Sequence, residues 1–123
     1  MAVILSADDD PDMRTLIERI LTLDGHRVVT APDGRAALEA AFEDRFDLVI
    51  LDVDMPRMRG LEACRALRDD PRTAHIPVII ASGSIEPPYD EVTSAGASTC
   101  VAKPFTPAAL RNAVDAQLAA STR

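Results

Sequence analysis

Acidic, hydroxyl and basic side chains follow four short apolar runs of the sequence. Asp8, Asp9 and Asp10 follow the run at 3–7, and Asp52 and Asp54 follow the run at 48–51. Ser82 with Gly83 follows the run at 77–81, and Lys103 with Pro104 follows the run at 99–102. Crowded carboxylates repel one another, which raises their pKa values and costs stability unless a hard cation neutralises them. Mg²⁺ prefers carboxylate oxygens from a few side chains, with room left for water. If the four segments meet in one pocket, they predict a Mg²⁺ site.

Asp52 is the best placed nucleophile of this set, because it ends the uniformly apolar run Leu48–Leu51. A carboxylate can form an aspartyl phosphate, while a metal ion and a lysine offset the charge on the transferring group. Lys103 supplies a compact positive charge, and Ser82 supplies a hydroxyl beside Gly83, whose backbone N–H can approach a ligand closely. The set therefore predicts phosphoryl transfer to Asp52.

The elements that must position these groups are short strands alternating with amphipathic helices. Apolar, largely β-branched runs occur at 3–7, 26–30, 48–51, 77–81 and 99–102, and a helical pattern follows each one. This alternation is typical of parallel strands joined by crossover helices. In such a doubly wound α/β sheet, ligands bind at the carboxyl ends of the strands. The candidate groups all stand at those ends.

The first helix carries signals at both of its ends. Asp10-Pro11 offers an N-cap followed by proline at the first helical position, so we interpret Asp10 as a cap and not as a metal ligand. Gly25 stands where a left-handed C-cap belongs. Between them, spacings of three and four place a set of apolar side chains on one inward face. The set is Met13, Leu16, Ile17, Ile20 and Leu21.

The fourth helix is expected to be the shortest. Pro87-Pro88 allows it to begin only near Tyr89, and Gly96 ends it soon afterwards. We therefore expect this helix to be short and mobile.

The composition is that of a soluble globular domain and argues against several classes of partner. The 123 residues carry a net charge of −7 without a cluster of Lys and Arg, which opposes binding to nucleic acid or to anionic lipid. No apolar run approaches the roughly 18 residues that a membrane span needs. The first residues lack the basic region of a signal peptide. We expect one cytoplasmic domain over residues 1–123, without an output domain in this chain.

The cysteines and histidines are assigned no chemistry. Cys64 and Cys100 lack the spacing of a metal motif, and we expect both to be small buried side chains. His26 and His75 have no partner ligands at metal spacing, so we expect them to be structural or exposed.

Four segments, taken in order, resemble the signatures of response-regulator receiver domains. They are ILSADDDP at 4–11, LDVDMP at 51–56, IASG at 80–83 and AKPF at 102–105, and together they cover essentially the whole chain. The resemblance implies a flavodoxin-like (βα)5 fold with a five-stranded parallel sheet in the order 2-1-3-4-5. It also implies a phosphorylation-dependent signalling switch in place of a turnover enzyme.

The same resemblance implies a role for each site residue. Asp8 and Asp9 would hold Mg²⁺ together with Asp52, which would accept a phosphoryl group from a histidine kinase or a phosphotransfer protein. Asp54 would lend its backbone carbonyl to the metal. The phosphoryl oxygens would be bound by Ser82 and Lys103, and the Lys103–Pro104 peptide would be cis. Phosphorylation would then change the affinity for a downstream protein that the sequence does not identify.

Two positions depart from the pattern of that family. Cys100 stands where the family usually carries a switch aromatic residue, so the output mechanism is in question here. Arg59 replaces the acidic or small polar residue that commonly precedes Gly60, which alters the charge beside the site. The phosphorylation chemistry is expected to survive both changes.

Two rival functions share part of these features. The Asp52-Val53-Asp54 run imitates the Asp-x-Asp motif of haloacid-dehalogenase-type enzymes, which would make the chain a small Mg²⁺-dependent phosphohydrolase. However, the motif follows the third strand and not the first, Met-Pro follows it, and 123 residues leave no cap domain. A flavodoxin-like flavin carrier shares the fold, but the acidic loop after the first strand would repel a flavin phosphate. We rank both below the switch.

Overall fold

Five parallel strands form one sheet in the order β2-β1-β3-β4-β5. They are β1 (Val3–Ala7), β2 (Arg27–Ala31), β3 (Leu48–Asp52), β4 (Val78–Ser82) and β5 (Thr99–Ala102). The computed structural model describes residues 1–55, 57–83 and 89–121. The strand order confirms the predicted flavodoxin-like, doubly wound architecture.

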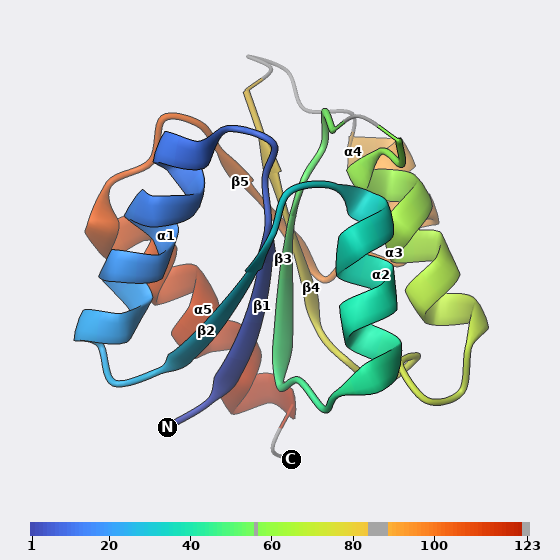
Figure 1. Ribbon diagram of the computed structural model, residues 1–123, viewed down its shortest axis with the longest axis horizontal. Helices are drawn as coiled ribbons and strands as arrows, with labels where there is room; N and C mark the ends of the chain where they lie inside the picture. The colour runs from blue at the N-terminus through green and yellow to red at the C-terminus, as the bar shows by residue number, and fades with distance from the viewer. Residues whose placement is uncertain (56, 84–88, 122–123) are drawn as a thin grey trace.

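Helices cover both faces of the sheet, as Figure 1 shows. One face is covered by α1 (Pro11–Leu23) and α5 (Pro107–Ser121), and the other by α2 (Gly34–Glu43), α3 (Gly60–Asp69) and α4 (Tyr89–Ser94). The helices among the described residues include none that is both long and apolar enough to cross a membrane. The sheet is therefore a middle layer between helices, and the helices leave the amino and carboxyl ends of its strands uncovered.

The core divides into two apolar clusters, one on each face of the sheet. In β3, Leu48 and Ile50 belong to the cluster under α1 and α5, while Val49 and Leu51 belong to the cluster under α2, α3 and α4. Leu48–Leu51 are buried, as the uniformly apolar run predicted, and Asp52 at the end of β3 is buried too. A strand covered on both faces favours apolar side chains on both, so Leu48–Leu51 show no alternation.

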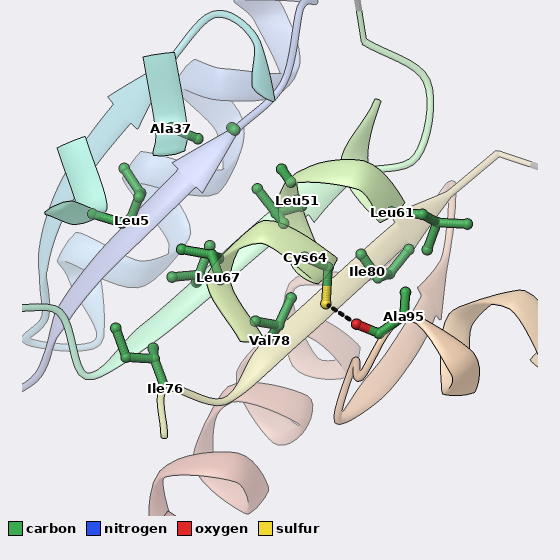
Figure 2. Close-up of a cluster of buried hydrophobic side chains, with 14 of the residues drawn as sticks. Leu5, Ala37, Leu51, Leu61, Cys64, Leu67, Ile76, Val78, Ile80 and Ala95 are labelled. Carbon is green, nitrogen blue, oxygen red and sulfur yellow. Dashed lines mark hydrogen bonds between the residues drawn. The ribbon is translucent and has the colours of Figure 1, made fainter. Parts of the chain in front are cut away.

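Cys64 lies inside the larger cluster, beside Leu67, Val78 and Ile80 (Figure 2). Its side chain is fully buried, and Sγ donates to the backbone oxygen of Ala95 at 3.3 Å. The prediction that this cysteine is a packing residue is thereby confirmed. The prediction that Cys100 is buried as well is wrong, because its side chain is only half-buried and packs against the same cluster from outside.

The ranges of β1 and β5 agree with the sequence prediction, whereas three strands differ from it: β2 and β4 are each shifted by one residue toward the C-terminus, and β3 is one residue longer. The second strand begins at Arg27 because the N–H of His26 donates to Leu21 O at 3.0 Å and closes the turn through Gly25, whose φ is 90°. The fourth strand begins one residue after Pro77, which has no N–H to donate. The third strand extends by one residue to include Asp52. The six-residue α4 is as short as predicted, and its mobility stays a prediction.

The assignment of Leu16 to the inward face of α1 is wrong. Ile17, Ile20 and Leu21 are buried, whereas Leu16 is 44% exposed. At about 100° per residue, Ile17, Ile20 and Leu21 span roughly 100° of the helix surface, and Leu16 lies about 40° outside that sector, on the side of Ile20. Apolar residues three or four positions apart share one face of a helix, but this spacing does not show which of them lie at the buried centre of that face and which at its exposed margin.

Candidate functional site

The predicted site residues meet at the carboxyl edge of the sheet, the upper edge in Figure 1. Asp52 is the last residue of β3 and Ser82 the last residue of β4, while Asp8 and Lys103 directly follow β1 and β5. The strand register pairs Ser82 with Ala102, and the N–H of Lys103 donates to Ser82 O at 2.7 Å. The parallel sheet thus brings four segments of the chain to one place.

Lys103 joins the two buried carboxylates of the site. Its Nζ lies 2.7 Å from Asp8 Oδ2 and 3.0 Å from Asp52 Oδ1. Asp8 is 1% exposed and Asp52 is 7% exposed, so both carboxylates are largely shielded from water. Lys103 is also the single lysine among the 13 Lys and Arg residues of the chain. An ammonium group differs from a guanidinium in being a compact point charge, which suits a site shared with small ions.

Asp9 completes a trio of acids with Asp8 and Asp52. One carboxylate oxygen from each of the three lies within 4.8 Å of the others, although Asp9 itself is exposed. Three carboxylates face one ammonium group, so the cluster keeps a net negative charge. This donor set, composed of oxygen ligands with an open side at Asp9, fits a hard divalent cation such as Mg²⁺.

The electrostatics of the site follow from burial and from this crowding. Burial raises the pKa of the Asp52 carboxyl above its ordinary value; the hydrogen bond from Lys103 opposes the rise, and repulsion from Asp8 and then Asp9 adds to it. Burial lowers the pKa of Lys103, but the hydrogen bonds to Asp8 and Asp52 outweigh it and leave that pKa raised. The lysine therefore stays charged, and a further cation would stabilise the ionised form of Asp52.

Asp10 lies beside this trio but acts as the N-cap of α1, as predicted. Its Oδ1 accepts from the N–H of Asp12 at 2.9 Å, and its own N–H donates to Asp8 Oδ1 at 2.9 Å. The cap thus connects the start of α1 to the buried carboxylate of Asp8.

Ser82 and Asp54 occupy different environments at the same edge. Ser82 is buried, with 1% exposure, at the end of β4. The carboxylate of Asp54 is exposed and lies 3.5 Å from Arg59 Nη2, outside the acidic trio. Only the backbone carbonyl of Asp54 was assigned to the metal, and that assignment stays a prediction. The Lys103–Pro104 peptide is cis, as the resemblance implied.

Two residues of the site were missed by the sequence interpretation. Arg14 donates from Nη1 to the backbone oxygen of Asp8 at 2.8 Å. Gly60 packs so closely under β3 that a Cβ there would collide with the backbone oxygen of Asp52. The sequence did carry one signal for Arg14. A cation near the N-terminus of a helix is disfavoured by the helix dipole, so an arginine at this position indicates a compensating contact.

A second cluster of potential ligands, Asp24, His26 and Asp115, lies away from this edge. His26 Nδ1 accepts a hydrogen bond from the N–H of Ala2 at 3.1 Å. A neutral imidazole that accepts at Nδ1 carries its proton on Nε2, which faces Asp24 at 3.7 Å and then has no lone pair for a metal. This arrangement agrees with the expected structural role of His26.

Comparisons with known proteins identify the class of domain. The family model of the response regulator receiver domain matches residues 4–115. The response regulator MprA of Mycolicibacterium vanbaalenii is 42% identical over 102 residues, which are 83% of this chain and 44% of that protein. The response regulator PleD of Caulobacter vibrioides is 41% identical over 106 residues, 85% of this chain and 23% of that protein. The chain thus spans less than half of either relative.

Solved structures show the same fold over nearly the whole chain. The chemotaxis response regulator CheY4 of Vibrio cholerae superposes with a TM-score of 0.90 at 34% identity, covering 95% of this chain and 98% of that one. The receiver domain of the sensor histidine kinase PA1611 from Pseudomonas aeruginosa PAO1, solved with a magnesium ion coordinated in its active-site cleft, has a TM-score of 0.89 at 28% identity, covering 96% and 98%. With the match of the family model and the geometry of the acidic edge, these likenesses show that the chain belongs to the response-regulator receiver-domain family.

Proposed function

We propose that this chain is a Mg²⁺-dependent phosphorylation switch that accepts a phosphoryl group on Asp52. The observation that carries the proposal is the position of Asp52 itself. Its carboxylate is buried at the end of the central strand, bonded to Lys103 and close to the carboxylates of Asp8 and Asp9. A nucleophile, a lysine and a set of oxygen ligands thus stand within reach of one phosphoryl group.

Each residue has a distinct part in the proposed reaction. Asp8, Asp9 and Asp52, with the backbone carbonyl of Asp54, would hold Mg²⁺, which supplies positive charge to the transferring phosphoryl group. A carboxylate oxygen of Asp52 attacks phosphorus, so that an O–P bond forms and the bond from phosphorus to the donor breaks. Lys103 and Ser82 then bind phosphoryl oxygens, the first by charge and the second by its hydroxyl.

The biological donor would be a histidine kinase or a phosphotransfer protein, and the output would be a changed affinity for a downstream protein. A phosphoryl group adds roughly one and a half to two negative charges at the edge of the sheet, enough to bias two arrangements of nearby segments. In this proposal residues 1–123 act as one receiver unit in the cytoplasm. The chain would catalyse its own phosphorylation and dephosphorylation and no other turnover.

The phosphohydrolase alternative is not favoured by the position of Asp54. An Asp-x-Asp phosphohydrolase needs its second carboxylate at the reacting group for proton transfer. Here that carboxylate is exposed and pairs with Arg59, apart from the acidic trio. The side chain of Asp54 is therefore poorly placed for such a role.

The test is the intact mass of the protein after incubation with acetyl phosphate, with Mg²⁺ or with a chelator. We expect one phosphoryl adduct that depends on Mg²⁺, is absent from Asp52→Asn and persists in Asp24→Asn, which removes an acid of the second cluster. Asp54→Asn keeps the backbone carbonyl and should still form the adduct. Equal incorporation into Asp52→Asn would rule out the assigned acceptor. Sustained turnover of a phosphate ester that is lost in Asp54→Asn would favour the phosphohydrolase.

A further inference from the structure

The side chain of Arg14 reaches back from α1 to the acidic loop that precedes the helix. Its Nη1 donates to the backbone oxygen of Asp8 at 2.8 Å, and the side chain is half-buried. Arg14 is the fourth residue of α1, close to the end of the helix where the dipole disfavours a cation. The hydrogen bond to Asp8 gives a reason for an arginine at this position.

Asp8 is held at each of its polar groups. Its N–H donates to Ala31 O at 3.1 Å, its Oδ1 accepts from the N–H of Asp10 at 2.9 Å, and its Oδ2 accepts from Lys103 at 2.7 Å. The remaining group, the backbone oxygen, accepts from Arg14. That oxygen belongs to the peptide that joins Asp8 to Asp9, so a donor bound to it sets the orientation of both acids.

We propose that Arg14 is a positioning residue for the metal site, which holds the Asp8–Asp9 peptide so that both carboxylates face Asp52. This inference rests on the proposed function, because it concerns the Mg²⁺ that Asp8, Asp9 and Asp52 would hold. Groups that orient metal ligands from outside the ligand set commonly change metal affinity by about 10-fold to 100-fold when they are removed. Arg14 makes such a contact through a backbone oxygen.

The charge of Arg14 and its hydrogen bond to Asp8 predict opposite effects of an Arg14 substitution on Mg²⁺ affinity. A guanidinium bonded to the backbone oxygen of Asp8 repels a divalent cation held by the Asp8 carboxylate, so removing its charge alone would tighten Mg²⁺ binding. Loss of the hydrogen bond would release the Asp8–Asp9 peptide and weaken Mg²⁺ binding. The sign of the change in affinity thus shows whether Arg14 acts by charge or by position.

The experiment is an NMR titration with MgCl₂ at constant ionic strength, following the backbone amides of Asp9 and Val53 in four proteins. They are the wild type, Arg14→Gln, Arg14→Lys and Arg19→Gln, the last of which removes the same charge from an exposed position of the same helix. We expect Arg14→Gln to weaken Mg²⁺ binding by about 10-fold, Arg14→Lys to recover part of the loss, and Arg19→Gln to bind as tightly as the wild type. Binding of Arg14→Gln at or above the wild-type affinity would overturn the proposal.

A second readout distinguishes positioning from a general loss of structure. The rate of phosphorylation by acetyl phosphate should need more Mg²⁺ in Arg14→Gln but reach the wild-type maximum when Mg²⁺ saturates. A lower stability in chelator with an unchanged Mg²⁺ midpoint would mean that Arg14 is only structural, and the proposal would fall. If the wild type itself bound no Mg²⁺, the proposed function would fail along with this inference. If the wild type binds Mg²⁺ and Arg14→Gln matches it, only the inference fails.

Discussion

Lys103 Nζ donates a hydrogen bond to Asp52 Oδ1 at 3.0 Å, across 51 positions of the chain. The same ammonium group also binds Asp8, so one side chain neutralises part of the charge of two buried acids. Replacing Lys103 by methionine keeps much of the apolar stem and removes this charge. In the absence of Mg²⁺ we expect the free energy of unfolding to fall by about 1–3 kcal/mol, because buried charged groups lose their partner.

Mg²⁺ should stabilise Lys103→Met more than it stabilises the wild type, because in the variant the ion meets the two carboxylates without a competing ammonium group. Denaturant unfolding with and without Mg²⁺ measures both effects. A selective ¹⁵N-lysine label gives a single Nζ signal in the wild type, because the chain has one lysine, and that signal should shift when Mg²⁺ binds. If Mg²⁺ stabilised the wild type and Lys103→Met equally, Lys103 would not compete with the ion for Asp8 and Asp52.

Mg²⁺ is expected to stabilise the folded chain through the trio Asp8, Asp9 and Asp52 and not through the second acidic cluster. At a concentration 100 times its dissociation constant, a ligand of the native state adds about 2.7 kcal/mol to the free energy of unfolding. Asp8→Asn should abolish most of this gain, whereas Asp24→Asn should keep it. The measurement is the denaturation midpoint in Mg²⁺ and in chelator. An unchanged gain in Asp8→Asn would refute the assigned ligand set.

Gly60→Ala should displace the backbone of Asp52, the proposed phosphoryl acceptor. A Cβ at position 60 would collide with the backbone oxygen of Asp52, whereas a Cβ at Gly83 would meet nothing within 4 Å. Gly60 also donates its N–H to Val53 O at 3.1 Å, so α3 cannot retreat without breaking this bond. We expect a loss of about 1–3 kcal/mol in stability and slower phosphorylation of Asp52.

Denaturant unfolding and the acetyl phosphate reaction check the two effects in Gly60→Ala. Gly83→Ala serves as the control for stability alone, because it adds the same methyl group in open space. If Gly60→Ala were as stable as Gly83→Ala, the start of α3 would be able to move away from Asp52 without loss of stability, and the prediction would be wrong.

The acid titration of Asp70 should depend on Arg72. The guanidinium of Arg72 donates to Asp70 Oδ1 and Oδ2 at 3.0 and 2.7 Å, and its backbone N–H donates at 2.8 Å. These bonds lower the pKa of Asp70 from 3.8 to about 2. A lowered folded pKa means that the pair contributes stability above the ordinary pKa of the acid and loses it as the pH falls toward about 2.

Arg72→Gln is therefore expected to return the Asp70 titration toward 3.8, which side-chain ¹³C NMR can follow. At about pH 3 the carboxyl should remain mostly ionised in the wild type and be mostly protonated in the variant, given the ordinary range of aspartate pKa values. Arg19→Gln, which lies on α1 and away from this turn, should titrate like the wild type. A wild-type midpoint near 4 would show that the bidentate pair does not persist in solution.

The sequence alone determined the order and type of the elements, because their signals are local. The cap at Asp10-Pro11 and the turn at Gly25 depend on hydrogen bonds within a few residues, and the apolar run Leu48–Leu51 is itself a local pattern. Each of these predictions was confirmed. The positions of Asp8, Asp52, Ser82 and Lys103 at strand ends could be predicted in the same way, since parallel strands place their carboxyl ends at one edge.

The tertiary structure decided which of those groups touch and what surrounds them. The bonds of Lys103 to Asp8 and Asp52, the collision that keeps position 60 a glycine, and the contact of Arg14 with Asp8 depend on how helices pack on the sheet. The exposure of Leu16 and the pairing of Asp54 with Arg59 depend on it too. Apolar periodicity, helix caps and turn residues are local patterns that specify strands and helices, but distances between side chains far apart in sequence are set only when the whole core has packed.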